Sequence, residues 1–378
     1  MQYRHFPGTD ITASTLGFGC MRFPTCEDGK IDRERAINML RHAIDCGVTY
    51  SDTAYPYHGG ESELVVGEAL SDGWREKVTL TTKLPLWKIE KYEDMEATLD
   101  EQLTKLRTDH VDFYLLHAMR NETYHKIRDL GAYKFLDDMV KKGKIRYPGF
   151  SFHDNAEVFA EIAQDYDWKL IQVQMNLLDE FNQATYAGVQ KYAAARGIGV
   201  VGMEPLRGGA LARTAPKEVQ SIYDAADEKR TPVEWAFRWL LDKPEFVTIL
   251  SGMSTEAQLD DNLRIFDQVK PHCLTDEQRD MLSRVRRAYE QRIRVGCTGC
   301  EYCQPCPRGV LIPRIFGGYD NACMFGDGKD FKTSYAQIVE KEGGADRCVG
   351  CGACEKQCPQ HIAIRDHLKA IHEEMTAQ

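Results

Sequence analysis

Eight short β-prone runs, separated by amphipathic helical segments, constrain the fold of this chain more than any other feature of its sequence. The runs are mostly apolar, as expected of parallel strands that are buried on both faces. Eight β–α units over roughly 250 residues match a closed (β/α)8 TIM barrel in number and length. The expected strands are Leu16–Gly19, Val48–Asp52, Val78–Lys83, Val111–His117, Ile145–Ser151, Leu170–Asn176, Gly199–Glu204 and Val247–Met253.

The segments between these runs carry apolar residues at helical spacing. An open, doubly wound sheet is the alternative, and it would place a glycine-rich phosphate loop after the first strand. The turn at that point, residues 19–24, reads Gly-Cys-Met-Arg-Phe-Pro and lacks this fingerprint. Residues 2–14, interrupted by Pro-Gly-Thr-Asp, predict a hairpin that covers one end of the barrel. The expected helices include Arg33–Cys46, Asp94–Leu106, Ala156–Gln164, Thr185–Arg196, Pro232–Leu241 and Ala257–Phe266.

Polar residues stand where several of these runs end. Asp52 closes the second run and Tyr57 follows it, while Lys83 and His117 end the next two. Because the carboxyl ends of barrel strands meet on one face, we expect the four side chains to lie together there. Each one alone has an ordinary interpretation as a cap or a packing residue. Together they suggest chemistry, since an ammonium lowers the pKa of a phenol, a carboxylate holds the ammonium, and an imidazole can orient a carbonyl.

The same residues resemble a motif of the aldo-keto reductase family, over residues 2–285. The resemblance implies that Tyr57 is the general acid, that Lys83 and Asp52 tune it, and that His117 orients the substrate. The implied reaction is reduction of an aldehyde or ketone by NADPH or NADH, or the reverse oxidation of an alcohol. The matching residues are Asp52-Thr53-Ala54, Tyr57, Glu61, Lys83 in Thr-Thr-Lys, and His117 in Asp-Phe-Tyr-Leu-Leu-His.

The resemblance also implies a nicotinamide site, with several departures. Phe152 replaces the usual Asn, Met203 stands where an aromatic residue stacks on the nicotinamide, and Gly252 and Gln258 occupy positions that are often basic. NADP and NAD therefore both remain open. The loops Leu86–Lys91 and Ala118–Lys126, with Trp87 and Met119, are candidates for contact with the substrate. The cofactor-binding candidates are Ser151, Gln174, Met203, Pro205, Leu206, Arg207, Gly208, Ser251, Gly252, Met253, Ser254, Gln258 and Asn262.

Nine of the thirteen cysteines lie between Cys297 and Cys358. In a chain without an export signal, such clustering indicates metal ligation rather than disulfides. Structural zinc is the alternative, but two cysteine runs that each end in Cys-Pro are typical of bacterial ferredoxins, where the last cysteine reaches the other cluster. We therefore expect two [4Fe–4S] clusters. One would be held by Cys297, Cys300, Cys303 and Cys358, and the other by Cys306, Cys348, Cys351 and Cys354.

These patterns predict a barrel domain over residues 1–285 and a small ferredoxin-like domain over 286–378, a combination that resembles the iron–sulfur branch of the aldo-keto reductases. The leading hypothesis is an NAD(P)H-dependent carbonyl reductase whose clusters serve structure or electron transfer, with a redox partner protein. The alternatives are a flavin at the barrel mouth that exchanges electrons with the clusters, and a non-catalytic electron carrier. A net charge of -10 argues against nucleic acid. The lack of long apolar runs predicts a cytoplasmic protein without membrane contact.

Overall fold

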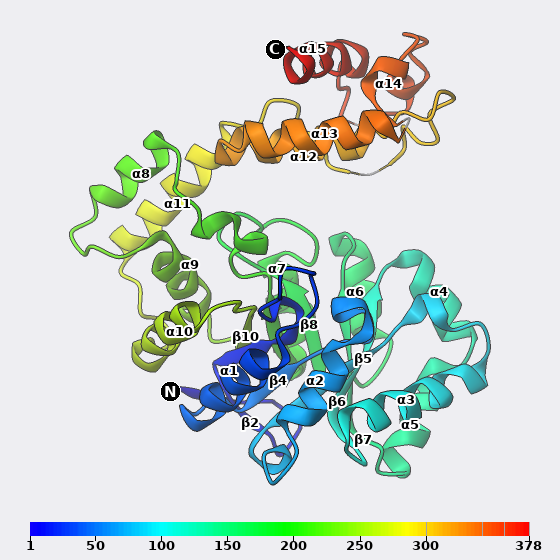
Figure 1. The fold of residues 1–378 in the computed structure, drawn as a ribbon, viewed down its shortest axis with the longest axis vertical. Helices are drawn as coiled ribbons and strands as arrows, with labels where there is room; N and C mark the ends of the chain where they lie inside the picture. Colours follow the sequence, from blue (N-terminus) through cyan, green and yellow to red (C-terminus); the bar gives the residue numbers. More distant parts are fainter. Residues whose placement is uncertain (300, 342, 359, 378) are drawn as a thin grey trace. The chain divides into compact units, whose positions relative to one another are not determined.

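The structure is a computed structural model that describes residues 1–299, 301–341, 343–358 and 360–377 (Figure 1). It divides into two compact units, which we call the barrel unit and the cysteine unit. The barrel unit comprises Met1–Leu211 and Thr231–Asp276, and the cysteine unit comprises Ala212–Arg230 and Glu277–Gln378.

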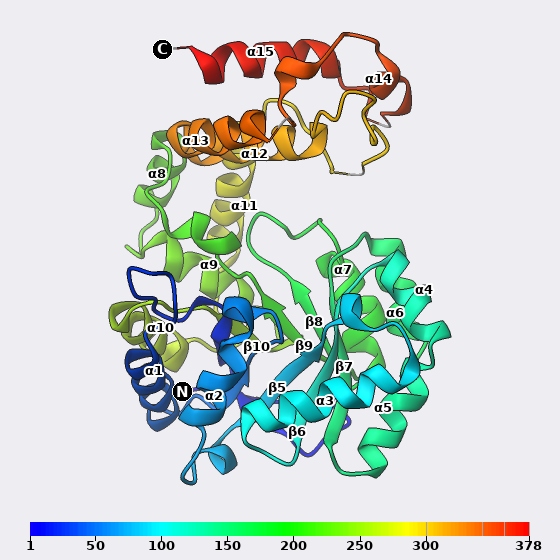
Figure 2. The same cartoon turned by 45° about the vertical axis from the view of Figure 1, so that its right-hand side comes forward.

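The barrel unit contains a closed barrel of eight parallel strands, in the order β10-β3-β4-β5-β6-β7-β8-β9. This confirms the expected fold, and each strand overlaps one of the eight runs. The central strands lie inside a ring of helices (Figure 2). The strands are β3 (Leu16–Gly19), β4 (Tyr50–Asp52), β5 (Thr79–Leu84), β6 (Val111–Met119), β7 (Ile145–Phe152), β8 (Leu170–Gln174), β9 (Gly199–Met203) and β10 (Phe246–Ser251).

Side-chain caps explain where several of the surrounding helices begin. Asp32, Asn155, Thr231 and Thr255 each accept a hydrogen bond from a backbone N–H in the first turn of the helix that follows. The helices of the barrel unit are α1 (Arg33–Asp45), α2 (Ser62–Ala69), α3 (Tyr92–Leu106), α4 (Asn121–Asp129), α5 (Ala132–Lys141), α6 (Ala156–Gln164), α7 (Tyr186–Gly188), α9 (Pro232–Leu241) and α10 (Glu256–Gln268).

Two expectations about individual segments were wrong. The range Thr185–Arg196 is not one regular helix, because α7 passes into a π-helical turn at Val189–Ala193 and a 3-10 turn at Ala194–Arg196. The range Ala118–Lys126 is not a loop, since β6 continues to Met119 and α4 begins at Asn121.

The N-terminal hairpin closes the end of the barrel where the strands begin. It pairs β1 (Tyr3–His5) with β2 (Thr12–Ser14) in antiparallel register. The ring of Phe6, fully buried, lies 4.8 Å from that of Phe113 between centroids. A Cβ at Gly199, the first residue of β9, would lie 2.3 Å from Phe6. The hairpin therefore closes this end of the barrel with buried hydrophobic side chains. The opposite end carries the C-terminal ends of the strands, where Asp52, Lys83 and His117 lie.

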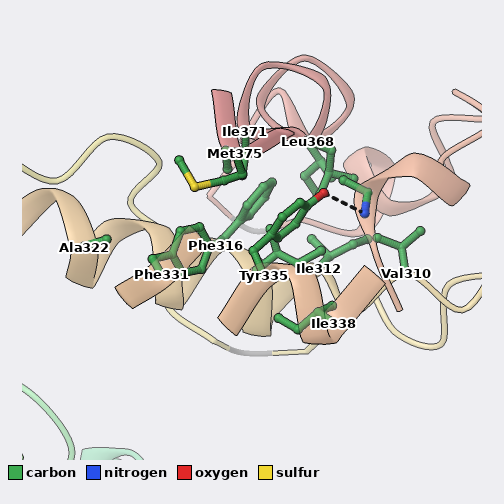
Figure 3. Packing of buried hydrophobic residues seen from close by; sticks show 13 residues of the cluster. Val310, Ile312, Phe316, Ala322, Phe331, Tyr335, Ile338, Leu368, Ile371 and Met375 are labelled. Carbon is green, nitrogen blue, oxygen red and sulfur yellow. Dashed lines mark hydrogen bonds between the residues drawn. The ribbon is translucent and has the colours of Figure 1, made fainter. Parts of the chain in front are cut away.

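The cysteine unit has a hydrophobic core of its own. Phe316, Phe331, Tyr335, Leu368 and Ile371 pack between three helices, and the backbone N–H of Ala345 donates a 3.3 Å hydrogen bond to the Tyr335 hydroxyl (Figure 3). Six partly buried cysteines pack against this core. Among the described residues, no helix combines the length and the apolar character that crossing a bilayer requires. The helices are α8 (Lys217–Asp224), α11 (Asp276–Glu290), α12 (Ile312–Phe325), α13 (Gly328–Glu340), α14 (Ala353–Gln357) and α15 (Ile364–Thr376).

Candidate active site

Asp52, Tyr57 and Lys83 meet at the C-terminal end of the barrel. Lys83 donates hydrogen bonds from Nζ to Asp52 Oδ1 at 2.6 Å, to the Thr53 carbonyl at 2.8 Å and to the Tyr57 hydroxyl at 3.4 Å. Asp52 is 2% exposed and Lys83 is 0% exposed. The adjacent strands β4 and β5 bring them together, because Asp52 lies opposite Thr81 in their parallel register. A carboxylate, an ammonium and a phenol thus form one hydrogen-bonded chain, in which Asp52 and Lys83 are buried and Tyr57 is partly buried.

The pKa values in this chain follow from burial and charge. Burial lowers the pKa of Lys83, but Asp52 and Tyr57 outweigh that effect and the net direction is upward. For Tyr57, burial raises the pKa and exceeds the lowering contribution of Lys83. Lys83 therefore acts on the phenol in the direction expected from the sequence, while the enclosure of the ring sets the net result. Both groups are protonated at neutral pH.

His117 lies beside this chain, and its imidazole is neutral. Burial, reinforced by the charge of Lys83 and by His153, lowers its pKa to about 3. Its ring centroid is 6.2 Å from that of Tyr57 and 5.4 Å from that of Trp87, which is 58% exposed. The buried Nδ1 of His117 forms no hydrogen bond within the described part of the chain. Met119, the other apolar candidate, is fully buried.

A second polar network lies directly behind Lys83, and we did not anticipate it from the sequence. Glu63, on α2, is fully buried and accepts hydrogen bonds of 2.7 Å from Thr82 and Gln102. Gln102, on α3, also donates to the carbonyl of Lys83 at 3.0 Å. Through Gln102, the Glu63 carboxylate is therefore linked to the backbone of Lys83. Glu63 is the second residue of α2, and nothing in the surrounding sequence indicates its contact with Gln102.

Two of the expected cofactor-binding residues already form hydrogen bonds within the protein, but to different extents. The Ser151 hydroxyl accepts a hydrogen bond from the backbone N–H of Ala118 at 2.8 Å, which leaves its own proton available. Gln174 donates to Asp179 at 2.8 Å and accepts from Gln183 at 2.7 Å. Ser151 is thus free to donate, whereas Gln174 is held within a network of side chains.

The loop after β9 presents its backbone in an unusual conformation. Glu204, Arg207, Gly208 and Gly209 all have positive φ angles. Positive φ turns successive N–H groups outward, which suits an anion. Met203, at the end of β9, accepts a 3.6 Å contact from the Gln172 amide through its sulfur and packs against the barrel core. Pro205 is buried and Leu206 is partly buried in the same loop.

The loop after β10 leads into the N-terminus of α10. Asn262 donates a 2.8 Å hydrogen bond to the buried Ser251 hydroxyl, which ties the strand end to the helix. The Gln258 side chain accepts a 2.8 Å bond from the backbone N–H of Ser254. Met253 is 1% exposed, so a buried side chain fixes the loop to the protein interior. The expected cofactor loops therefore follow neighbouring strands at the same end of the barrel as Asp52, Tyr57, Lys83 and His117, which we call the quartet.

A broad polar groove lies at the opposite end, near the starts of the strands. Asp112 dominates its chemistry, because it receives 2.9 Å hydrogen bonds from both Arg75 and Arg146. None of the four quartet residues lines this groove. Charge pairs at this end of a barrel contribute to stability, whereas chemistry occurs at the other end.

In the cysteine unit, side chains brace the loops that carry the cysteine motifs. Asp320, 7% exposed on α12, accepts hydrogen bonds of 2.8–3.0 Å from the backbone N–H groups of residues 294–296, just before Cys297. Cys297, Cys303 and Cys358 line one small cavity. Cys300 lies outside the described residues. The cavity therefore brings the last cysteine of the second motif to two cysteines of the first.

A sequence model described as the aldo/keto reductase family matches residues 15–285. The chain belongs to the aldo/keto reductase family. As a member, it is an NAD(P)-dependent oxidoreductase. It is 25% identical to the "Probable aldo-keto reductase 1" of Glycine max, covering 66% of this chain and 80% of the relative. It is 26% identical to the "NADH-specific methylglyoxal reductase" of Escherichia coli, covering 68% and 90%.

This chain also resembles solved structures of aldo-keto reductases. The holo form of aldo-keto reductase AKR11C1 from Bacillus halodurans superimposes with a TM-score of 0.64 at 25% identity, covering 75% of this chain and 96% of that one. A second sequence model, described as a 4Fe-4S dicluster domain, matches residues 296–364. The cysteine unit is therefore a ferredoxin-like iron–sulfur domain joined to the reductase barrel.

The residues present fit both groups that the family assignments imply. For the nicotinamide, the orphaned Nδ1 of His117 and the positive-φ loop after β9 lie at the barrel mouth. For the clusters, the donor set is thiol sulfur, the usual ligand of iron in such domains. Within the described ranges, which omit Cys300, no three metal-binding side chains converge closely enough to hold an ion. The fit of the clusters therefore rests on the donor set and on the shared cavity.

Proposed function

We propose that this aldo/keto reductase reduces the carbonyl group of a small aldehyde or ketone to an alcohol, and that Tyr57 donates the proton. The hydrogen-bonded chain from Asp52 through Lys83 to Tyr57 carries this proposal, because Asp52 keeps Lys83 charged and Lys83 stabilises the phenolate of Tyr57. A bound NAD(P)H supplies the hydride. Carbonyl, NAD(P)H and one proton give alcohol and NAD(P)+, so the reaction is balanced without a further reductant.

Each side chain of the quartet has its own role in this reaction. Neutral His117 hydrogen-bonds the carbonyl oxygen and orients it towards the Tyr57 hydroxyl. Tyr57 gives its proton to that oxygen as negative charge develops there. Lys83 stabilises the phenolate that results, and Asp52 keeps Lys83 charged and fixed. Water then returns a proton to Tyr57.

For the cofactor, we propose the residues expected from the sequence, in two groups. Ser151 has a free proton for the carboxamide, and Gln174 would join it by releasing Gln183. The Escherichia coli relative named for methylglyoxal and NADH supports a small carbonyl substrate and leaves NADH open beside NADPH. The loops that would hold the phosphates contain Met203, Pro205, Leu206, Arg207, Gly208, Ser251, Gly252, Met253, Ser254, Gln258 and Asn262.

We further propose that the cysteine unit binds two [4Fe–4S] clusters with crossed ligands. Cys358 would join Cys297, Cys300 and Cys303 at one cluster, and the common cavity supports this set. Bracing of the loop by Asp320 supports the same cluster. The other would be held by Cys306, Cys348, Cys351 and Cys354. The clusters would serve structure or pass single electrons to a partner protein.

Replacement of Tyr57 by Phe tests the proposed reaction. It removes one oxygen, so we expect NAD(P)H-dependent turnover of a small aldehyde to fall by roughly 100-fold or more while cofactor binding persists. Tyr55→Phe is the matched control, because its hydroxyl accepts a 2.8 Å hydrogen bond from Lys88 outside the quartet. It should retain turnover. Undiminished activity in Tyr57→Phe would refute the proposal.

The flavin and electron-carrier alternatives predict different optical results. An anaerobic titration of the purified protein with NADPH, and separately with NADH, would follow the visible absorption of the clusters. Bleaching without a carbonyl substrate would require a one-electron relay, and a flavin would then be sought in the acid-denatured supernatant. Unbleached clusters, with carbonyl-dependent loss of the nicotinamide band, would support the reductase.

A further inference from the structure

Three loops that follow neighbouring strands border one side of the barrel mouth. Strand β10 pairs with β9 on one side and with β3 on the other. The loops after β9 and β10 are the two proposed phosphate loops. The loop after β3 lies against them, since the Ser254 hydroxyl donates a 2.8 Å hydrogen bond to the carbonyl of Arg22. Arg22 is the basic residue in this third loop.

The side chain of Arg22 lies across Gly252. A Cβ at Gly252 would meet Arg22 Cγ at 2.6 Å and Arg22 Cβ at 2.8 Å. The backbone of Gly252 is not in the left-handed region, so the stem of Arg22 is what excludes a side chain there. This explains why glycine occupies a position that is often basic in the family that the sequence resembles. The positive charge comes from the adjacent loop instead.

The guanidinium of Arg22 extends from Gly252 to the loop after β9. Its Nη2 lies 4.0 Å from the Cβ that Gly208 would carry. Among the residues that the structure describes, no side chain forms a hydrogen bond or an ion pair with this guanidinium. By contrast, Arg264 on α10 is paired with Glu234 at 3.0 Å and with Asp261 at 2.8 Å.

The carboxylate of Glu204 lies close enough to Arg22 for the two charges to interact. Burial raises the pKa of Glu204, Asp179 adds to this effect, and Arg22 and Arg207 oppose it. Arg207 itself faces Asp179 at 3.7 Å. Both arginines thus act on Glu204, only Arg207 faces Asp179, and Arg22 keeps its donors available for an external anion.

We propose that Arg22 binds the pyrophosphate of the nicotinamide cofactor, between the loops after β9 and β10. This inference rests on the proposed function and assigns a residue that the family resemblance did not supply. A guanidinium offers parallel N–H donors that match two phosphate oxygens. The pyrophosphate fits better than a 2′-phosphate, because Arg22 spans both glycine loops, while Gln258 at the start of α10 already bonds Ser254. Arg22 should therefore serve NADH and NADPH alike.

Calorimetric binding of NADH, NADPH and ADP-ribose to the complete protein tests this assignment without any turnover. ADP-ribose contains the pyrophosphate but no nicotinamide. Loss of a charge-assisted bidentate contact should weaken all three in Arg22→Ala by roughly 10- to 100-fold. Arg22→Lys should weaken them less, and Gly252→Ala should reproduce much of the loss by displacing the Arg22 stem. Arg33→Ala, which removes an exposed arginine paired with Glu68 on the outside of the barrel, should change nothing.

Each outcome has a distinct meaning. Equal weakening for the three ligands supports the assignment. Unchanged affinity in Arg22→Ala, with wild-type binding intact, overturns this inference and leaves the proposed function standing. Weakening of NADPH alone overturns it in favour of a 2′-phosphate contact. If the wild-type protein binds none of the three, the proposed function and this inference fail together.

Discussion

The buried pair of Lys83 and Asp52 leads to a quantitative prediction about stability. At the 2.6 Å separation of Nζ and Oδ1, their attraction is about 6 kcal/mol at an effective dielectric constant of 20. Removal of both ions from water costs several kcal/mol each, so the intact pair contributes little net stability. Burial already raises the pKa of Asp52 and Lys83 opposes this, so Lys83→Met leaves Asp52, 2% exposed, buried as an unpaired charge or as a carboxyl that must take up a proton. We expect this variant to lose about 3–5 kcal/mol of barrel stability.

The double variant Asp52→Asn/Lys83→Met separates charge from packing. It has no uncompensated ion, so it should recover most of the loss even where Lys83→Met alone folds poorly. Urea unfolding, followed by the fluorescence of the buried Trp168 and Trp235, measures both variants. A single variant within about 1 kcal/mol of wild type, or a double variant no more stable than the single one, would refute the reasoning.

Two further predictions concern protons and iron. Because burial lowers the pKa of His117 from 6.5 to about 3, only the unfolded chain takes up a proton there between these pH values, and stability falls as the pH drops. Urea unfolding at pH 7 and pH 5 measures how much the free energy of unfolding decreases on acidification. In His117→Gln this decrease should be smaller by on the order of 2 kcal/mol. A decrease equal to that of the wild type would contradict a neutral imidazole. Cys358→Ser should reduce iron and sulfide from about eight to about four atoms each per chain, whereas Cys323→Ser should not. Unchanged iron in Cys358→Ser would contradict Cys358 as a cluster ligand.

The sequence predicts the barrel and the quartet well for a physical reason. Parallel strands are buried on both faces, so their apolar runs are easy to locate, and polar residues at their ends stand out. Asp52, Lys83 and His117 lie on successive strands, and closure of the barrel brings them to one face. The proximity of these side chains is thus encoded by local patterns.

What the sequence does not reveal depends on contacts between distant segments. Glu63 and Gln102 meet behind Lys83 from two different helices, and nothing local to either residue indicates this. Gln174 matches a cofactor motif, yet Gln183 from the following loop occupies its amide. Arg22 lies in a turn without a known fingerprint, and its significance emerges only where its stem covers Gly252. Such pairings require the tertiary structure.

The pairing of β3 with β10 also bears on how the chain folds as it is synthesised. Leu16 pairs with Ile249, so the first barrel strand acquires its second neighbour only after nearly the whole barrel sequence has left the ribosome. Until then one side of β3 exposes unpaired backbone groups, a surface that recruits other strands. The nascent barrel is therefore open to aggregation for most of its synthesis. A truncated chain that ends before Phe246 would keep this edge permanently, and chaperones that bind extended segments would be expected to hold it.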